Sequence, residues 1–200
     1  MYESGTGVPQ SYTEAVKWYL KAARRGHAPA QNSVGVLYRD GNGVARSRCT
    51  AREWFVKAAY QGHAAAQCNL GMLYRLDNNH SEAMEWFMEA AHQQDAEAQF
   101  NIGVMYYEGC SVLPDLSKAK AWYLRAANQR FAMAQFSTGA IYDHGEGDHQ
   151  DYFTAAKWYS SSADQGCAPA QYNLGILYQH GRGVTKNISK ALECYDKAAV

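Results

Sequence analysis

The apolar residues of this chain follow a helical pattern that repeats along its length. Within residues 28–63, one stripe has the i, i+4, i+7, i+8 spacing of a helix face and consists of Ala30, Val34, Leu37 and Tyr38. A second stripe with similar spacing follows a polar segment and consists of Ala51, Trp54, Phe55, Ala58 and Ala59. The two stripes predict a pair of amphipathic helices. The small residues Gly35, Ala58 and Ala59 are expected to let neighbouring helices approach closely, with the aromatic side chains filling the remaining volume.

The same two stripes recur at a nearly constant interval. An aromatic pair begins at Trp18, Trp54, Trp86, Trp122 and Trp158, with Cys194 in the sixth position, so the interval is 36 residues except for one of 32. A helix glycine keeps this interval at Gly35, Gly71, Gly103, Gly139 and Gly175, as does a tyrosine three residues later. Since independent columns share one period and one four-residue deletion, the chain is a tandem repeat.

Residues that favour helix ends occur at fixed points of the repeat. A residue with an oxygen-bearing side chain opens each second helix and is expected to cap its N-terminus: Ser11, Ser47, Asn79, Asp115, Asp151 and Asn187. The spacings Ser11–Glu14 and Asn79–Glu82 also predict capping boxes. Pro29 and Pro169 suit the first turn of a first helix, and Gly-x-Gly turns, such as Gly41 with Gly43 and Gly145 with Gly147, predict positive φ.

Two longer stretches carry a specific motif. Residues 171–184 keep most of Ala-Gln-x-Asn-Leu-Gly-x-x-Tyr-x-x-Gly-x-Gly-Val, and residues 17–23 with 61–62 show Lys-Ala-x-x-Trp-Tyr-x-Lys-Ala-Ala-x-Gln-Gly. The motif resembles the Sel-one-like repeat family, a branch of the tetratricopeptide superfamily. The resemblance implies an all-α, right-handed solenoid of antiparallel helix pairs.

We expect one solenoid over residues 1–200, with a partial repeat at 1–27 and repeats at 28–63, 64–95, 96–131, 132–167 and 168–200. The 64–95 copy has lost its glycine loop, and Cys110 and Ser111 interrupt another.

Four variable positions of each first helix share the face opposite the packing stripe. Stacked repeats would join these faces into a concave strip, and the resemblance implies that such a strip binds a protein or peptide partner. By repeat, the strip consists of Asn32, Val36, Arg39 and Asp40; Cys68, Met72, Arg75 and Leu76; Phe100, Val104, Tyr107 and Glu108; Phe136, Ala140, Asp143 and His144; and Tyr172, Ile176, Gln179 and His180.

Part of this strip is predicted to form a partner-binding groove. Its predicted residues are Arg39, Met72, Arg75, Phe100, Val104, Tyr107, Phe136, Asp143, Tyr172, Ile176 and Gln179. The aromatic ladder of Phe100, Phe136 and Tyr172 would supply anchors, and the arginines would face an acidic end of the partner, because aromatic residues and Arg are enriched at binding hot spots. The alternative is that these side chains only fill contacts between neighbouring helices.

Charge and composition exclude several classes of partner. The chain has 19 basic and 19 acidic side chains and a formal net charge of +0, with no basic cluster of the kind that binds nucleic acid. Its apolar runs are too short to span a membrane, and its N-terminus lacks the pattern of a secretory signal. We therefore predict neither nucleic-acid binding nor membrane insertion.

The cysteines bear on the cellular compartment. The cysteines are Cys49, Cys68, Cys110, Cys167 and Cys194. The sequence has an odd number of cysteines, which argues against a disulfide framework, and no Cys-x-x-Cys motif, which argues against a thiolate metal site. This favours the cytoplasm. The sequons at Asn79 and Asn187 weigh against it, and the resemblance leaves the endoplasmic reticulum lumen and the bacterial envelope as alternatives.

No motif for chemistry stands apart from the repeat, so no cofactor, metal or catalytic residue is predicted. Ser117-Lys118-Ala119-Lys120 matches the Ser-x-x-Lys of penicillin-recognising enzymes, but the partner motifs Ser-Asp-Asn and Lys-Thr-Gly are missing. The segment 143–151, with His144 and His180 at equivalent positions, offers metal-binding side chains without an established ligand spacing. We predict a non-catalytic scaffold or adaptor. The alternatives are a lactamase-like or metal-dependent enzyme and a structural spacer in a larger protein.

The two ends of the chain suggest a longer array. Tyr2 aligns with Tyr38 in the last turn of a first helix, and Val200 ends a second helix without a polar capping helix after it. Because terminal repeats of solenoids need polar caps, we expect apolar ends that can self-associate.

Overall fold

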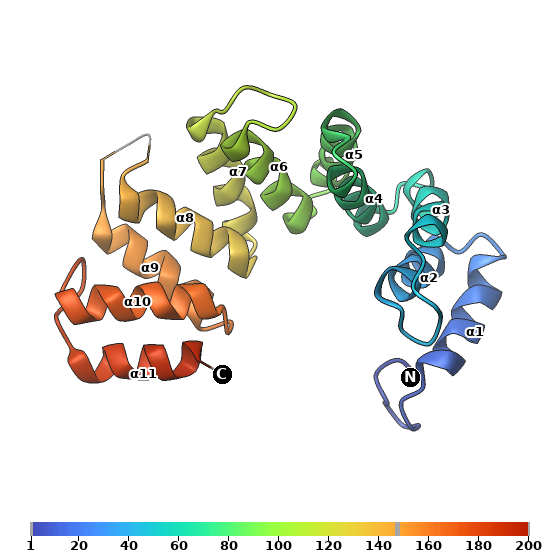
Figure 1. Ribbon diagram of the computed structural model, residues 1–200, viewed down its shortest axis with the longest axis horizontal. Coiled ribbons are helices and arrows are strands. Elements are labelled where there is room, and N and C mark those ends of the chain that lie inside the picture. Colours follow the sequence, from blue (N-terminus) through green and yellow to red (C-terminus); the bar gives the residue numbers. More distant parts are fainter. Residues whose placement is uncertain (1, 147–148, 200) are drawn as a thin grey trace. The chain divides into compact units, whose positions relative to one another are not determined.

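The computed structural model describes residues 2–146 and 149–199, and these residues form helices without any strand (Figure 1). The described helices are α1 (Tyr12–Ala23), α2 (Ala28–Asp40), α3 (Arg48–Ala59), α4 (Ala64–Leu76), α5 (His80–His92), α6 (Ala96–Glu108), α7 (Leu116–Asn128), α8 (Ala132–His144), α9 (Tyr152–Ala163), α10 (Ala168–His180) and α11 (Ile188–Ala198). They belong to two compact units: unit 1 covers residues 1–95 with α1 to α5, and unit 2 covers residues 96–200 with α6 to α11.

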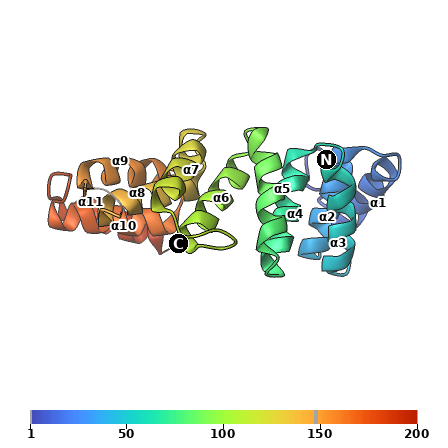
Figure 2. The same cartoon turned by 90° about the horizontal axis from the view of Figure 1, so that it is seen from above.

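Both units are built from helix pairs of the predicted kind. The pairs are α2 with α3 and α4 with α5 in unit 1, and α6 with α7, α8 with α9 and α10 with α11 in unit 2. Within a unit, the second helix of one pair also packs on the first helix of the next, as α9 does on α10. Figure 2 shows the same helices from above. The all-α, tandem helix-pair fold predicted from the sequence is confirmed.

The predicted stripes form the core. Val34 and Leu37 of α2 are buried, as are Phe55, Ala58 and Ala59 of α3, whereas the first member of the aromatic pair, Trp54, is half-buried. Trp54 packs against a core of Ala23, Ala30 and Val34, which come from the end of α1 and from α2. Burial of this apolar surface is the main contribution that holds successive helix pairs together.

The helix glycines contact the second member of the aromatic pair. A Cβ built on Gly35 would lie 2.5 Å from Cε1 of Phe55, and one built on Gly103 would lie 2.6 Å from Cδ1 of Tyr123. The same arrangement joins Gly71 to Phe87, Gly139 to Tyr159 and Gly175 to Tyr195. The close approach predicted from the glycine column therefore occurs inside each helix pair, against one ring.

Five of the six predicted N-caps accept the expected hydrogen bond. The side chains of Ser11, Ser47, Asp115, Asp151 and Asn187 each accept from the backbone N–H three residues later. The prediction for Asn79 is wrong, because its side chain makes no capping bond. The shortened loop explains this: Asn78 has φ 60°, and Asn79 enters α5 with ψ 71°, whereas Ser47 has an extended backbone with ψ 106°.

The predicted capping boxes are also wrong, because the backbone N–H of the N-cap residue donates to a backbone carbonyl and not to the glutamate side chain. The backbone N–H of Ser11 donates to the carbonyl of Tyr2 at 2.8 Å, and that of Asn79 donates to the carbonyl of Tyr74 at 2.9 Å. Ser47, Asp115, Asp151 and Asn187 donate in the same way to the recurring tyrosine of the preceding helix. The Glu14 carboxylate instead pairs with Lys17 at 2.7 Å. A loop-closing backbone bond therefore fixes the connection within each repeat.

The turn and proline predictions hold where the structure describes them. Gly41 and Gly43 have φ 79° and 73°, and Gly145 has φ 71°. Pro29 and Pro169 lie in the first turns of α2 and α10. Gly147 and Asp148 lie outside the described residues, as does Val200.

Buried glutamines connect the helices of each unit through hydrogen bonds. In unit 1, the Nε2 of Gln67 donates to the carbonyl of Ala59 at 3.3 Å, while its Oε1 accepts from Nε2 of Gln93 at 2.7 Å. In unit 2, Gln135 donates to the carbonyl of Ala127 at 3.2 Å and accepts from Gln165 at 2.7 Å. The glutamine of the recurring Ala-Gln dipeptide therefore links the preceding second helix to the following one.

Candidate functional site

The predicted binding strip lies on the first helices, and its residues differ in accessibility. We call the variable residues of α2 and α4 in unit 1, and of α6, α8 and α10 in unit 2, the first-helix strip, and we describe each unit by itself. Several strip residues contact the second helix of their own pair. Such contacts are compatible with a partner-binding groove and with side chains that only fill the space between helices. The exposed side chains and the pockets decide what remains available to a partner.

The aromatic ladder of unit 2 packs on the second-helix aromatic residues. The ring centroids of Phe100 and Tyr123 are 5.5 Å apart, and those of Phe136 and Tyr159 are 5.9 Å apart. Phe100 and Phe136 are half-buried by these contacts. Tyr172 packs on Tyr195 at 5.6 Å but keeps 55% of its surface exposed. The three residues align as predicted, but only Tyr172 presents most of its ring to solvent.

Two polar strip residues bind the hydroxyl groups of the same second-helix tyrosines. The Tyr159 hydroxyl donates to Oδ2 of Asp143 at 3.1 Å and accepts from Nδ2 of Asn173 at 3.1 Å. Burial, followed by the nearby Asp143 carboxylate, raises the pKa of Tyr159. The Tyr195 hydroxyl donates to Oε1 of Gln179 at 2.7 Å. Asp143 and Gln179 therefore orient the aromatic floor of the strip.

A pocket of about 240 Å³ opens on the strip of unit 2. Its walls come from α6, α7, α8 and the start of the loop after α8, and they consist of Tyr107, Tyr123, Phe136, Ser137, Ala140, Ile141, His144 and Glu146. The Tyr107 hydroxyl donates to Oε1 of Glu146 at 3.3 Å, and the Glu146 charge raises the pKa of Tyr107. An apolar floor with a few polar groups at its rim is the usual make-up of a ligand-binding pocket.

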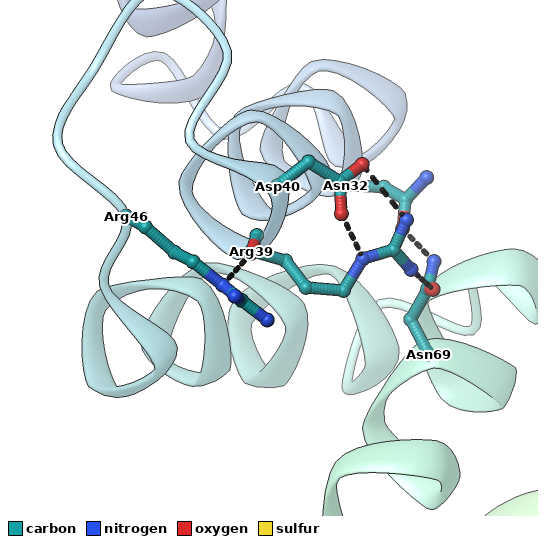
Figure 3. Close-up of polar contacts among 5 residues, drawn as sticks. All are labelled: Asn32, Arg39, Asp40, Arg46 and Asn69. Carbon is teal, nitrogen blue, oxygen red and sulfur yellow. Dashed lines mark hydrogen bonds and ion pairs between the residues drawn. The ribbon is translucent and has the colours of Figure 1, made fainter.

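The strip of unit 1 is polar and internally bonded. Figure 3 shows the guanidinium of Arg39 between Asp40 and Asn69. Its Nε lies 2.7 Å from Oδ1 of Asp40, and its Nη1 donates to Oδ1 of Asn69 at 2.7 Å. Asn69 in turn donates to Oδ1 of Asn32 at 3.0 Å, which connects α4 with α2. The guanidinium also holds the pKa of Asp40 below its usual range. Arg39 therefore links two repeats as well as facing the strip.

The remaining residues of the predicted groove are half-buried. Met72 and Arg75 lie on α4, Val104 lies on α6 and Ile176 lies on α10. Val104 packs against the core that includes Tyr123 and Ile141. Cys68 is buried at 2% exposure, so this position of the strip is not open to a partner.

The residues considered for chemistry have local structural contacts. Lys120, the lysine of the Ser-x-x-Lys match, places its ammonium 4.2 Å from the Tyr142 ring centroid, and the neighbouring Lys118 pairs with Asp115 at 3.3 Å. Two other histidines, His27 and His63, are the N-caps of α2 and α4, where Nδ1 of each accepts from a backbone N–H at 3.2 Å. In residues 2–146 and 149–199, no group of three or more His, Cys, Asp or Glu side chains is arranged to hold a metal ion. Gly147 and Asp148 of the considered segment lie outside the described residues.

Glu146 and Asn69 contact strip residues, although the sequence did not place either of them in the predicted groove. Glu146 lies in the glycine loop, outside the periodic helix positions, and Asn69 lies on α4 outside the predicted groove positions. Each is identified by its hydrogen-bond partner from another repeat. None of the described helices is long and apolar enough to cross a membrane.

Solved structures share this architecture. A protective antigen of uropathogenic Escherichia coli that displays an SLR fold is 32% identical, with a TM-score of 0.83 over 99% of this chain and 43% of that chain. A Sel1 repeat protein from Oxalobacter formigenes is 33% identical, with a TM-score of 0.82 over 94% of this chain and 76% of that chain. This chain thus spans less than half the length of the Escherichia coli protein.

More distant structures share the fold alone. The immunity protein Pa5087 from Pseudomonas aeruginosa is 20% identical, with a TM-score of 0.70 over 99% of this chain and 79% of that chain. No curated protein matches the sequence.

The repeats themselves match a family model. The Sel1 repeat model matches residues 1–27, 28–63, 64–95, 96–131, 132–167 and 168–199. These matches extend over almost the whole sequence and coincide with the helix pairs of both units. The chain therefore belongs to the Sel1 repeat family.

Proposed function

We propose that this protein is a non-catalytic scaffold that binds partner polypeptides along the first-helix strip. The observation that carries the proposal is the pocket of about 240 Å³ on unit 2, where aromatic and polar strip residues from α6 and α8 meet. A pocket of this size accepts one side chain of a polypeptide. The exposed rings of Tyr107, in the pocket wall, and of Tyr172, on α10, offer further contact area on the strip. The strip residues that line the pocket, including Tyr107, Phe136 and His144, occupy repeat positions that vary, as partner-specific contacts require.

Peptides selected by display against the whole chain test the proposal. Tyr107→Ala and Tyr172→Ala should each weaken a selected peptide about tenfold or more, because truncation of an aromatic anchor commonly costs more than 1 kcal/mol of binding free energy. Both rings are exposed, so the fold should survive, which circular dichroism would check.

Phe153→Ala is the matched control. Phe153 is an exposed aromatic residue of unit 2, but it lies on the second helix α9. Phe153→Ala should leave the affinity for the peptide within about twofold of wild type, because Phe153 is not part of the strip that contacts the peptide. Equal effects of all three variants, or no effect of any, would contradict a site on the strip.

The protein-binding scaffold is preferred to the alternatives for physical reasons. A structural spacer would need no pocket on the variable face. A lactamase-like enzyme would need Ser117 and Lys120 in a shared pocket, but the ammonium of Lys120 lies over the Tyr142 ring, 4.2 Å from its centroid. A lack of nitrocefin turnover by the chain would be consistent with this preference, and the peptide measurements would separate scaffold from spacer. The cytoplasm remains the compartment that we propose, on the basis of the cysteine content.

A further inference from the structure

Tyr60 and Trp86 form the corner of an open pocket in unit 1. Their ring centroids are 5.4 Å apart and their planes meet at 89°. Tyr60 follows the last residue of α3 and is 77% exposed, and Trp86 is half-buried on α5. The pocket has a volume of about 710 Å³, and α5 supplies most of its remaining walls through Met84, Glu85, Met88 and Glu89.

Trp86 lacks the cation that covers equivalent tryptophans of the repeat. Three residues after the tryptophan, Lys57 places its ammonium 4.3 Å from the Trp54 ring, and Arg125 places its guanidinium 4.3 Å from the Trp122 ring. Lys21 makes the corresponding contact with Trp18 at 5.3 Å. The equivalent residue on α5 is Glu89. A position that holds a cation in three repeats therefore holds a carboxylate beside Trp86.

Two further departures from the repeat occur at the same place. Helix α5 carries Glu82, Glu85 and Glu89 without any Lys or Arg, whereas every other second helix that the structure describes has at least one basic residue. Tyr60 is also the only Phe, Tyr or Trp at its position of the repeat sequence, which elsewhere holds Arg24, His92, Asn128, Asp164 and Val200. Two aromatic walls and two carboxylates thus come together in one pocket, with no basic side chain among its lining residues.

We propose that this pocket binds an arginine side chain of a partner polypeptide. The flat guanidinium stacks on an aromatic face and donates several hydrogen bonds in one plane, so it can contact Trp86 and a carboxylate of Glu85 or Glu89 together. Arg125 on Trp122 is an example of the aromatic contact within this chain. The two methionines offer an adaptable apolar surface to the arginine stem. The site lies apart from the first-helix strip and does not depend on the function proposed for it.

Fluorine NMR of the chain labelled with 5-fluorotryptophan tests the site directly. The probes are a blocked pentapeptide with a central arginine and its citrulline counterpart, which keeps the shape but not the charge. The arginine peptide should shift the Trp86 resonance saturably and bind about tenfold more tightly than the citrulline peptide, because the attraction to the ring and the carboxylates requires the charge. Equal binding of the two peptides would overturn the proposal, as would shifts confined to other tryptophans.

Charge-reversal variants identify the residues responsible. Glu89→Lys gives α5 the cation found beside Trp54 and Trp122, so the chain should fold normally and lose about tenfold in affinity for the arginine peptide. Glu82→Lys, with the same charge change on the same helix but outside the pocket, should keep wild-type affinity. Wild-type binding by Glu89→Lys would overturn the proposal.

A third variant and another probe test two remaining possibilities, which are that Glu89→Lys does not fold and that the pocket prefers a small quaternary ammonium ion. If Glu89→Lys failed to fold, Tyr60→Ala, which truncates an exposed side chain, should show the same tenfold loss. Full binding by Tyr60→Ala would overturn the proposal. Tighter binding of tetramethylammonium than of the arginine peptide would also overturn it, since the site would then suit a small quaternary ammonium ion.

Discussion

Thr138 occupies a core position at which the other repeats carry Val34, Leu70, Ile102 and Leu174. Its side chain is 0% exposed, and its hydroxyl oxygen has no hydrogen-bond partner among the described residues. A buried polar group without a partner costs about 1–3 kcal/mol. This residue therefore lowers the stability of unit 2 at a point where the repeat calls for an apolar side chain.

Thr138→Val should raise the free energy of unfolding by about 1 kcal/mol, since it removes the unpaired hydroxyl and keeps the shape. Denaturant unfolding followed by circular dichroism measures the change. The reverse change at the equivalent position, Val34→Thr, should lower the free energy of unfolding by about 1–3 kcal/mol. A less stable Thr138→Val variant would show that the hydroxyl has a partner in solution.

Asp151 predicts a pH dependence of stability. Its carboxylate accepts hydrogen bonds from the hydroxyl and backbone N–H of Thr154, and these hold its pKa below the usual range. The unfolded chain then binds the proton more readily, so this contribution is present above the unfolded pKa of about 3.9 and is lost as the pH falls through the folded pKa.

Asp151→Asn keeps a capping oxygen without a titrating group. The fall in melting temperature between about pH 6 and pH 2 should therefore be smaller in the variant than in the wild type. Thermal unfolding at a series of pH values provides the comparison. Parallel curves would mean that Asp151 makes no such contribution.

Single residues differ in how far the sequence predicts their contacts. The five confirmed N-caps were predictable because capping depends only on residues three apart. Asn79 was not, because the shortened loop alters the backbone before α5. The hydrogen bonds of Arg39 and Glu146 join different repeats, and such partners depend on packing that periodicity does not specify.

The close contact between a helix glycine and an aromatic ring defines each helix pair. Glycine in a helix interior usually costs about 0.5–1 kcal/mol relative to alanine. Here the missing Cβ makes room for a ring, as Phe55 shows against Gly35. The packing gain of the ring offsets the conformational cost of the glycine.

Gly35→Ala should therefore destabilise the chain by about 1–3 kcal/mol, as overpacking does, in spite of the better helix propensity of alanine. Combining it with Phe55→Leu should give a smaller loss than the sum of the single effects, because the smaller side chain leaves room for the methyl group. Denaturant unfolding of the four proteins in the cycle measures this coupling. A stabilised Gly35→Ala variant would contradict the packing described here.

At the level of elements, periodicity predicted the helices, their order and the turn glycines. It did not predict the glutamine bonds, because a recurring residue shows that a position is constrained without naming its partner. Gln67 and Gln93 are 26 residues apart in sequence, and their contact depends on the stacking of α4 and α5. Positive φ at Arg130, which takes the place of a recurring glycine, was likewise visible only in the structure.

Across the whole molecule, the recurring residues form the core of the helix pairs, and the variable residues determine the polarity and the pockets of the surface. The chain forms two compact units, and the first of them ends at Asp95, the last residue of the shortened repeat. Unit 2 carries the aromatic strip and its pocket, and unit 1 carries the bonded Arg39 strip and the acidic Trp86 pocket. These differences between units give a scaffold two chemically distinct surfaces.

Hydrogen–deuterium exchange of the whole chain, with and without a display-selected peptide, tests the central claim most directly. If partners bind the first-helix strip of unit 2, the peptide should slow exchange in α6, α8 and α10, with smaller changes in α7, α9 and α11. Protection confined to the second helices, or no protection in unit 2 at peptide saturation, would contradict the claim.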